Sequence, residues 1–425
     1  MNTRNFLVSA VASCILLSVV SAVHADVVTE WNEIMVQTAQ VATPDPVLRA
    51  RTAAIAQVAV FEAVNSIVGD YEPYDHALVA PQGASAEAAA VAAAHRVLAT
   101  LHPQATSQLD AARDQSLAII PDSTAKTAGI AVGVAAADSI IALRADDGVD
   151  APVNYTPGTL PGEYRPTPPD FTPAFRPGFG QVATFAIRNG RQFRAAPPPA
   201  LRSKLYAVAF EEVKRVGEAN SPQRPEDRAQ IARFYAVADV DTIYYPAARQ
   251  IIATRSRKVS ENARLFALLS MAIWDGAIAC LESKYHFNLW RPVTAIREAQ
   301  TDGNRRTEPD SAWAPLVFTP PFPSYPSAHA SLGGAARAVL EHEFGRAGHV
   351  ITLTHPALSG IVLHYTAFAQ ITDDIDDARI YGGIHYRFDQ QAGARQGKRV
   401  AEYVLRHALR PACAHRDRKR GATAQ

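Results

Sequence analysis

Three clusters of residues near the C-terminal end have side chains that suit the binding of an oxyanion. They are Lys284, Arg291 and Pro292, then Pro326, Ser327 and His329, and last Arg379, Gly383, His385 and Asp389. The cations supply positive charge, the imidazoles supply ring nitrogens, and the hydroxyl lies at a loop–helix junction. This combination suits a tetrahedral or trigonal-bipyramidal anion, phosphate or its isostere vanadate, and therefore one of two chemistries.

The middle cluster follows a proline-rich loop, PPFPSYPSAH, and precedes a helix predicted over residues 328–345. Ser327 occupies the position of a helix N-cap, and the amides of Ala328 and His329 would be free in the first turn. Such a turn is an anion site because free amides and the helix dipole both attract negative charge. The alternative is an ordinary serine cap beside a surface histidine.

The last cluster contains a histidine and an aspartate four residues apart. Gly382 and Gly383 permit a close backbone approach, after which a helix is predicted over residues 385–408. His385 and Asp389 would then share one helix face, so the carboxylate can accept a hydrogen bond from the imidazole. That bond fixes the tautomer and leaves the other ring nitrogen free as a ligand or nucleophile. An ordinary surface pair is the alternative.

The first cluster supplies Lys284 and Arg291 just after a helix predicted over residues 260–282. Arginine makes planar, bidentate contacts with oxyanions, and Pro292 is expected to end the local helix. A solvated, charged helix end is the alternative. Asp275 is interpreted either as a buried acid that balances these cations or as a surface residue.

Three neighbouring features have weaker interpretations. Trp290 is expected to pack in the core, and the role of His286 stays open. A run of aspartates is interpreted as a solvated helix start, because it lacks the spacing of a hard-cation loop. The run consists of Asp373, Asp374, Asp376 and Asp377.

Helices are the main elements that must position these residues. Asp45 and Pro46 are the cap and first residue of one helix. Further helices are predicted over residues 84–101, 104–118, 124–145, 200–217, 225–238 and 357–370. Prolines, glycines and aromatic residues dominate 147–199, which we interpret as an ordered loop. No alternating pattern is long enough for a real sheet, so we expect an all-α fold of antiparallel helical bundles.

The composition excludes some partners and indicates export. Of 425 residues 48% are hydrophobic and 20% charged, which is ample for a core, and the net charge of +1 argues against nucleic acid. Arg4 and the apolar residues 6–20 resemble an export signal with cleavage after Ala25, or alternatively an uncleaved anchor. No other stretch is predicted to span a membrane, so we expect a secreted or periplasmic protein.

The predicted organisation has four parts. They are a signal peptide at 1–25, an N-terminal helical half with its loop at 26–199, a catalytic bundle at 200–410 and a basic tail at 411–425. After cleavage two cysteines remain, Cys280 and Cys413. Export permits a disulfide between them, and burial of Cys280 in its apolar helix is the alternative.

The three clusters resemble the signature of the vanadium-dependent haloperoxidase and type 2 phosphatidic acid phosphatase superfamily. That signature reads K-x6-R-P, P-S-G-H and S-R-x3-G-x-H-x3-D, and the match covers residues 284–389. The phrases YRPTPPDFTPAF, RPGFG and RQFRAAPPPAL resemble bacterial vanadium-haloperoxidase-like proteins, so the likeness extends over most of the mature chain. Two positions depart from the signature: Ala328 replaces its glycine, and Ala378 replaces its serine.

The resemblance implies two four-helix bundles and vanadate as cofactor. Hydrogen peroxide would oxidise a halide to hypohalous acid, which halogenates a small organic acceptor. The residues implied to hold the equatorial oxygens are Lys284, Arg291, Ser327, Ala328 through its amide, and Arg379. His385 would bond the vanadium, His329 would be the acid–base group, and Asp389 and Gly383 would support the site.

Two other functions use the same residues. In a secreted acid phosphatase, His385 would be the nucleophile and His329 would protonate the leaving alcohol. A binding protein would keep the anion pocket without catalysis. The chain length and the lack of several predicted spans favour the peroxidase. So does Phe322, which resembles the phenylalanine of chloroperoxidases and would line a halide pocket or only pack in its turn. Leu281, where some chloroperoxidases carry tryptophan, disfavours an identical pocket.

Overall fold

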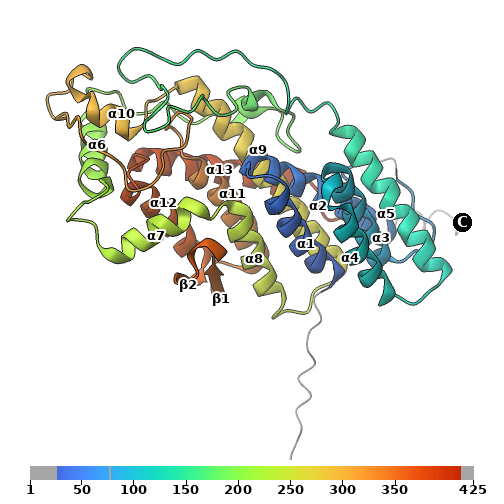
Figure 1. Cartoon of the computed structure of the whole chain (residues 1–425). Coiled ribbons are helices and arrows are strands. Elements are labelled where there is room, and N and C mark those ends of the chain that lie inside the picture. Colours follow the sequence, from blue (N-terminus) through green and yellow to red (C-terminus); the bar gives the residue numbers. More distant parts are fainter. Residues whose placement is uncertain (1–25, 76–77, 413–425) are drawn as a thin grey trace, which may run out of the picture.

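The computed structural model describes residues 26–75 and 78–412. The predicted export signal, Cys413 and the tail beyond it lie outside the described residues. Helices dominate the described part of the chain, which confirms the all-α class, and they form two groups that share one long central helix (Figure 1). The predicted boundary between residues 199 and 200 stays a prediction.

The N-terminal group is built from capped, alanine-rich helices. Its members are α1 (Val27–Ala42), α2 (Pro46–Val68), α3 (Ala86–Leu101), α4 (Thr106–Ala118) and α5 (Thr124–Leu143). Asp45 caps α2 as predicted, since its carboxylate accepts from the amides of Val47 and Leu48, and Pro46 is the first helical residue. Small side chains let α3 pack closely against α2 and α5.

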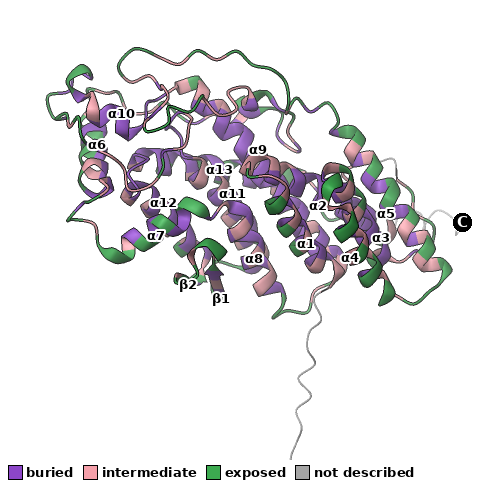
Figure 2. Cartoon of the chain, viewed as in Figure 1, coloured by how far each residue is buried: buried purple, intermediate pink, exposed green. Residues whose placement is uncertain are grey.

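The C-terminal group surrounds the 29-residue helix α9 (Val259–Phe287). The other helices are α6 (Lys204–Gly217), α7 (Glu226–Val237), α8 (Val240–Ile252), α10 (Pro292–Arg297), α11 (Ala328–Phe344), α12 (Phe368–Tyr381) and α13 (Arg387–His407). Helix α9 is buried along most of its length and contacts α2, α11 and α13 (Figure 2). It therefore belongs to the cores of both groups.

The sequence was predicted to contain no stretch after the export signal that is long and apolar enough to span a bilayer, and by these two criteria the prediction is wrong. Among the described residues, α5 and α9 are both long and apolar enough. In α9, 94% of the most apolar 18-residue segment is buried inside the protein, which identifies α9 as a core helix. In α5, only 33% of the corresponding segment is buried. Helix α5 lies at the outer edge of the N-terminal group (Figure 2).

A small hairpin corrects the prediction of a helix over residues 357–370. Strands β1 (Ala347–Thr354) and β2 (Val362–Ala367) pair antiparallel, and α12 begins only at Phe368. The segments HVITLT and VLHYTA are rich in β-branched residues, and in β1 buried and exposed positions alternate. The pattern that predicts strands was therefore present, in two segments that are each short.

Several helix ends also differ from their predictions, and α1, α8, α10 and α12 were not predicted as separate helices. Helix α9 ends at Phe287 because Asn288 is left-handed, with φ of 51°. Pro292 does not end a helix but begins α10, and α13 begins two residues after His385. These shifts place Arg291 and His385 in turns that precede helices.

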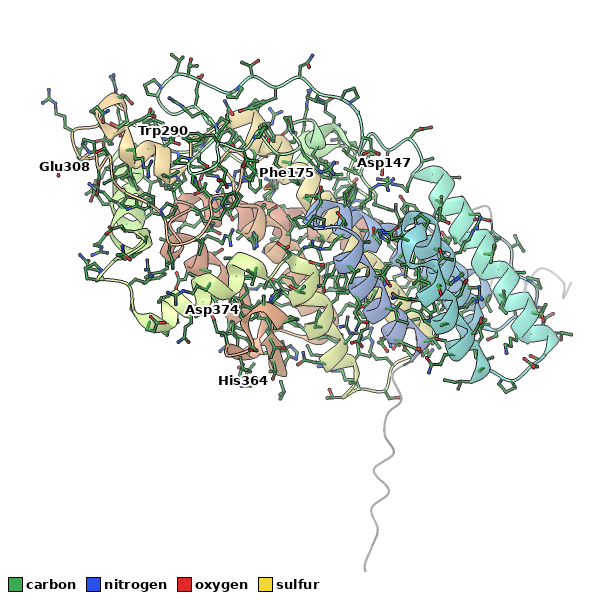
Figure 3. All side chains as sticks on the ribbon, in the orientation of Figure 1. Asp147, Phe175, Trp290, Glu308, His364 and Asp374 are labelled. Carbon is green, nitrogen blue, oxygen red and sulfur yellow. The ribbon has the colours of Figure 1, made fainter. Side chains whose placement is uncertain are left out.

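The proline-rich loop is ordered and lies across the end of α9, as Figure 3 shows for Phe175. The Tyr164 amide donates to the Asn288 carbonyl at 2.7 Å, and the Arg176 guanidinium pairs with Asp45 at 2.7 Å. Further along, the amides of residues 185–187 donate to the Asp275 carboxylate. Asp275 is fully buried, which confirms one part of the buried-acid interpretation and makes the surface alternative wrong. Its carboxylate holds this loop and does not contact the cations, so the predicted balancing of their charge is wrong.

Candidate active site

The fold brings His385 and the cations of the first and last clusters together in one buried site. Lys284 comes from the last turn of α9, Arg291 from the N-cap of α10, and Arg379 from the last turn of α12. Each of these side chains is at most 4% exposed. Arg291 Nη1 lies 3.1 Å from His385 Nε2, so the first and last clusters are in direct contact. The solvated alternatives for these residues are therefore wrong.

His385 is held in one tautomer from both sides of its ring. Its Nδ1 lies 2.7 Å from Asp389 Oδ2, the pairing that the spacing predicts. Arginine has only donors, so the contact from Arg291 requires Nε2 to be an unprotonated acceptor. Burial, and then the neighbouring Arg291 charge, lower the pKa of His385 well below its usual value. The imidazole is thus neutral, with its lone pair on the face that carries the arginine.

Backbone carbonyls of the PPFPSYPS loop bind two of the cations. Lys284 Nζ donates to the carbonyls of Pro323 at 2.7 Å and Ser324 at 2.9 Å. Arg291 Nε donates to the Phe322 carbonyl at 2.7 Å. The Phe322 ring covers both cations, 4.7 Å from Lys284 Nζ and 4.8 Å from Arg291 Cζ. Burial lowers the pKa of Lys284 to about 7, because carbonyls replace water only in part.

The site has more buried positive charge than its own residues neutralise. Arg379 Nη1 donates to the Tyr235 carbonyl at 2.6 Å, but Arg379 Nε and Arg291 Nη2 are buried without a hydrogen-bond partner among the described residues. Burial lowers the pKa of both arginines to about 10. Burial also raises the pKa of Asp389, the carboxylate beside them, to about 6. Orphaned guanidinium donors beside a neutral imidazole nitrogen fit an oxyanion such as vanadate or phosphate.

Two backbone features predicted from the sequence are present. Ser327 is the N-cap of α11, where its hydroxyl accepts from the Ala330 amide at 3.4 Å, and Ala328 is the first helical residue. Gly383 has φ of 80°, and a Cβ there would lie 2.3 Å from the Gly217 carbonyl oxygen. Only glycine therefore permits this approach of the turn before His385 to the end of α6.

His329 lies on an adjoining cavity of about 80 Å³. Its side chain is 22% exposed, and its Nε2 is 3.9 Å from Asp239 Oδ1. Burial, and then Arg379, lower the pKa of His329 well below its usual value. The cavity is lined by Pro46, Val47, Ala50, Phe175, Asp239, Val240, Ala277, Leu281, Phe322, Ala328, His329 and Leu332. Phe322 and Leu281 thus lie in the cavity wall, and residues before 199 complete it.

An ion-pair group beside this cavity was not anticipated from the sequence. Arg49 on α2 contacts Asp239 and donates from Nε to Asp241 Oδ2 at 2.8 Å. Asp239 is the N-cap residue of α8. The only signal was that Arg49 lies at the start of an apolar helical segment, VLRARTAAIAQVAV, where a buried arginine requires a partner.

The weaker sequence interpretations have mixed outcomes. Trp290 is buried and its indole donates to the Tyr206 hydroxyl at 3.1 Å, as packing predicts. His286 is exposed and contacts Arg194, not the site. The aspartate run is not a helix start: it lies in the middle of α12, where Asp374 and Asp377 pair with Arg228.

Cys280 lies on α9 immediately beside the site. It is a free, fully buried thiol whose sulfur is 3.7 Å from the Pro326 carbonyl oxygen. Burial raises the pKa of the thiol to about 11. Of the two alternatives, the buried helical cysteine describes Cys280.

Comparisons with known proteins agree with this architecture. Residues 264–412 match a family model described as the VCPO second helical-bundle domain. Vanadium chloroperoxidase of Curvularia inaequalis is 25% identical over 464 residues, which cover 82% of this chain and 75% of that protein. Among solved structures, the first bacterial vanadium-dependent iodoperoxidase is similar with a TM-score of 0.75 and 24% identity, covering 91% of this chain and 96% of that one. An apo-type bacterial vanadium-dependent chloroperoxidase has a TM-score of 0.68 and 18% identity. The likeness covers 85% of this chain and 92% of that one. The structural likenesses show a shared fold.

Proposed function

Since the chain belongs to the vanadium haloperoxidase branch of its superfamily, we propose that it is a vanadate-dependent haloperoxidase. Hydrogen peroxide would oxidise a halide to hypohalous acid, and a small organic molecule would be the final acceptor. The observation that carries the proposal is the excess of buried positive charge around a neutral histidine. That excess supports a bound oxyanion, and the similarity to vanadium haloperoxidases supports vanadate.

Each residue of the site has a role that follows from its position. Arg291 Nη2 and Arg379 Nε are the orphaned donors available to the anion's oxygens, together with Lys284 and the first amides of α11. His385 offers Nε2 as the nitrogen ligand, and Asp389 fixes its orientation. Bound vanadate would act as a Lewis acid that polarises peroxide without changing its own oxidation state.

His329 is the group available for proton transfer. It lies at the start of α11 and lines the cavity, whereas Lys284, Arg291 and Arg379 are not among the lining residues. Its lowered pKa leaves it unprotonated at neutral pH, as a base that removes a proton from hydrogen peroxide must be. Asp239, 3.9 Å away, is the nearest carboxylate to this imidazole and stabilises it when it becomes protonated.

The test uses the chain from Asp26, prepared free of phosphate and assayed with and without orthovanadate. One assay follows bromination and chlorination of a dione dye with hydrogen peroxide. A second follows hydrolysis of an aryl phosphate. Halogenation that appears only with vanadate is the expected result, and chloride turnover would support the halide-pocket role of Phe322. Hydrolysis that vanadate inhibits, without halogenation, would make the protein a phosphatase on the same scaffold.

A further inference from the structure

We propose that Phe175 is a halide-selectivity residue, a wall of the cavity at His329 that makes the cavity favour weakly hydrated halides. This inference rests on the proposed haloperoxidase function. Phe175 comes from the proline-rich loop, more than 100 residues before the three clusters, and it forms part of the same wall as Phe322. It lies where the loop crosses the end of α9 (Figure 3).

The backbone of Phe175 is fixed on both sides. Its amide donates to the Pro321 carbonyl at 2.7 Å, and its own carbonyl accepts from the Tyr285 hydroxyl at 2.5 Å. Its ring centroid is 6.1 Å from that of Phe322, at an interplanar angle of 49°. The loop is thereby joined to the segment that binds the cations, and the two rings form a continuous aromatic surface.

An ion pair next to Phe175 joins the proline-rich loop to the start of α2, which also lines the cavity. Arg176 pairs with Asp45 at 2.7 Å, and Asp45 also caps α2. The first turns of α2 place Val47 and Ala50 in the cavity lining. One carboxylate therefore fixes the loop and α2 together, and the pair is largely shielded, with Arg176 23% and Asp45 14% exposed. A shielded pair of this kind holds its geometry better than a fully exposed one.

Hydration, not size, is the property on which such a cavity discriminates. A volume of about 80 Å³ exceeds the ~30 Å³ that one water molecule occupies in the liquid, so a single halide ion fits with room to spare. The lining is mainly aliphatic and aromatic, and its ionisable members are Asp239 and His329. Such walls cannot replace the water lost by an anion, and this loss is most unfavourable for the smallest, most strongly hydrated halide. Arg49 offsets the charge of Asp239.

The cavity should therefore discriminate against chloride relative to bromide and iodide, beyond the difference in how easily they are oxidised. Replacing Phe175 with alanine opens the wall to water and removes part of this discrimination. We expect the ratio of kcat/KM for iodide to that for chloride to fall by about tenfold, the effect of losing one apolar wall. Phe175→Leu, which keeps an apolar side chain, should retain most of the ratio. Arg176→Gln should shift it in the same direction as Phe175→Ala but less.

The matched control is Phe171→Ala, which removes a ring from the same loop at a site that is 62% exposed. This variant should leave the ratio unchanged. Vanadate affinity, measured by calorimetry, should be the same in all four variants, because none of these side chains contacts the cations' free donors. Equal affinity would also show that each variant is folded.

Diffraction from crystals soaked in bromide provides a readout that does not depend on turnover. The anomalous signal of bromide should be present in the cavity of the wild type. A wild type that oxidises halides, with the same selectivity ratio in Phe175→Ala and Phe171→Ala, would overturn the inference and leave the proposed function intact. Failure of the wild type to oxidise any halide would overturn the function, and bromide missing from its cavity would overturn the inference.

Discussion

Two groups of buried arginines in this protein differ in how their charge is offset. Arg49 lies between two carboxylates, Asp239 and Asp241, and its pKa is raised because their attraction outweighs burial. Arg291 and Arg379 donate to carbonyl oxygens and lie near a neutral imidazole, and burial lowers the pKa of both because it outweighs their attraction to Asp389 and Asp239. In the first group the arginine is ion-paired within the protein and the only unpartnered atom among the described residues is an acceptor, Asp241 Oδ1, whereas the second group leaves the donors Arg291 Nη2 and Arg379 Nε without partners. The contrast distinguishes a structural charge cluster from a binding site.

The largest effect is expected from removing Arg49, the cation of the ion-paired group. In Arg49→Met, Asp241 loses its cation while it remains buried, and the half-buried Asp239 loses one of its cations. The free energy of unfolding should fall by about 3–5 kcal/mol, the usual effect of leaving a buried charge unpaired. Urea denaturation of the anion-free protein measures this change. A loss below about 1 kcal/mol would show that the pair is not needed to stabilise the contact between α2 and α8.

The second-largest effect is expected in the group that contains Arg291 and Arg379, where removing a cation should change anion affinity and not stability. In Arg379→Met the anion-free protein should be as stable as the wild type or more so, because one of several repelling charges is gone. Its affinity for vanadate should fall by about 100-fold, as expected when a buried charged partner is truncated. Calorimetric titration in phosphate-free buffer measures the affinity and urea denaturation the stability. Equal destabilisation of Arg379→Met and Arg49→Met would remove the distinction between the two groups.

A smaller effect concerns protons. The pKa of Lys284 is about 7 in the anion-free protein and about 10.4 in an unfolded chain. Between these values the unfolded state binds more protons, so the stability of the anion-free protein should rise with pH, by at most ~1.4 kcal/mol per pH unit. An anion favours the charged lysine, so its binding should take up a proton and weaken as pH rises above 7.

Calorimetry in buffers with different heats of ionisation measures that proton uptake directly. Lys284→Met is the control, because it removes the titrating group and should reduce the uptake. Anion affinity that is constant between pH 7 and 9 in the wild type would contradict the assignment of Lys284 as the titrating cation.

The smallest effect on anion affinity is expected at the second histidine. His329 faces the cavity, whereas His385 contacts the guanidinium of Arg291, which carries one of the unpaired donors. His329→Ala should therefore change vanadate affinity by less than about threefold while halogenation falls by 10²-fold or more, as for the loss of a general acid–base group. His385→Ala should weaken vanadate binding and stop turnover. Loss of vanadate binding in His329→Ala would show that the two roles are not divided in this way.

The parts of the site that could be predicted depend on short spacings. The serine cap of α11 and the His385–Asp389 pair each lie within five residues, so local geometry determines them. The cluster types also predicted an anion site, because three cations and two imidazoles have few other uses. The contact of Arg291 with His385, 94 residues apart, was inferred from the resemblance and not from spacing.

The parts that could not be predicted depend on distant contacts. Arg49 and Asp239 are 190 residues apart, and no periodicity within either helix indicates their pairing. Phe175 lies in a segment without regular structure, so nothing local predicts which of its aromatic rings faces the cavity. The hairpin was missed for a different reason, since two alternating segments of six residues are too short to outweigh the helical pattern around them.

The buried thiol of Cys280 has a consequence for how long such a catalyst would last. Oxidants attack the thiolate, and a thiol with a pKa of about 11 is almost entirely protonated at neutral pH. It is also the only thiol among the residues the structure describes, and it is fully enclosed. If the protein generates hypohalous acid beside this residue, the acid would meet a protonated thiol, which reacts more slowly than a thiolate. Self-inactivation during turnover should then begin with oxidation of exposed side chains at the surface, leaving the centre of the molecule intact until late.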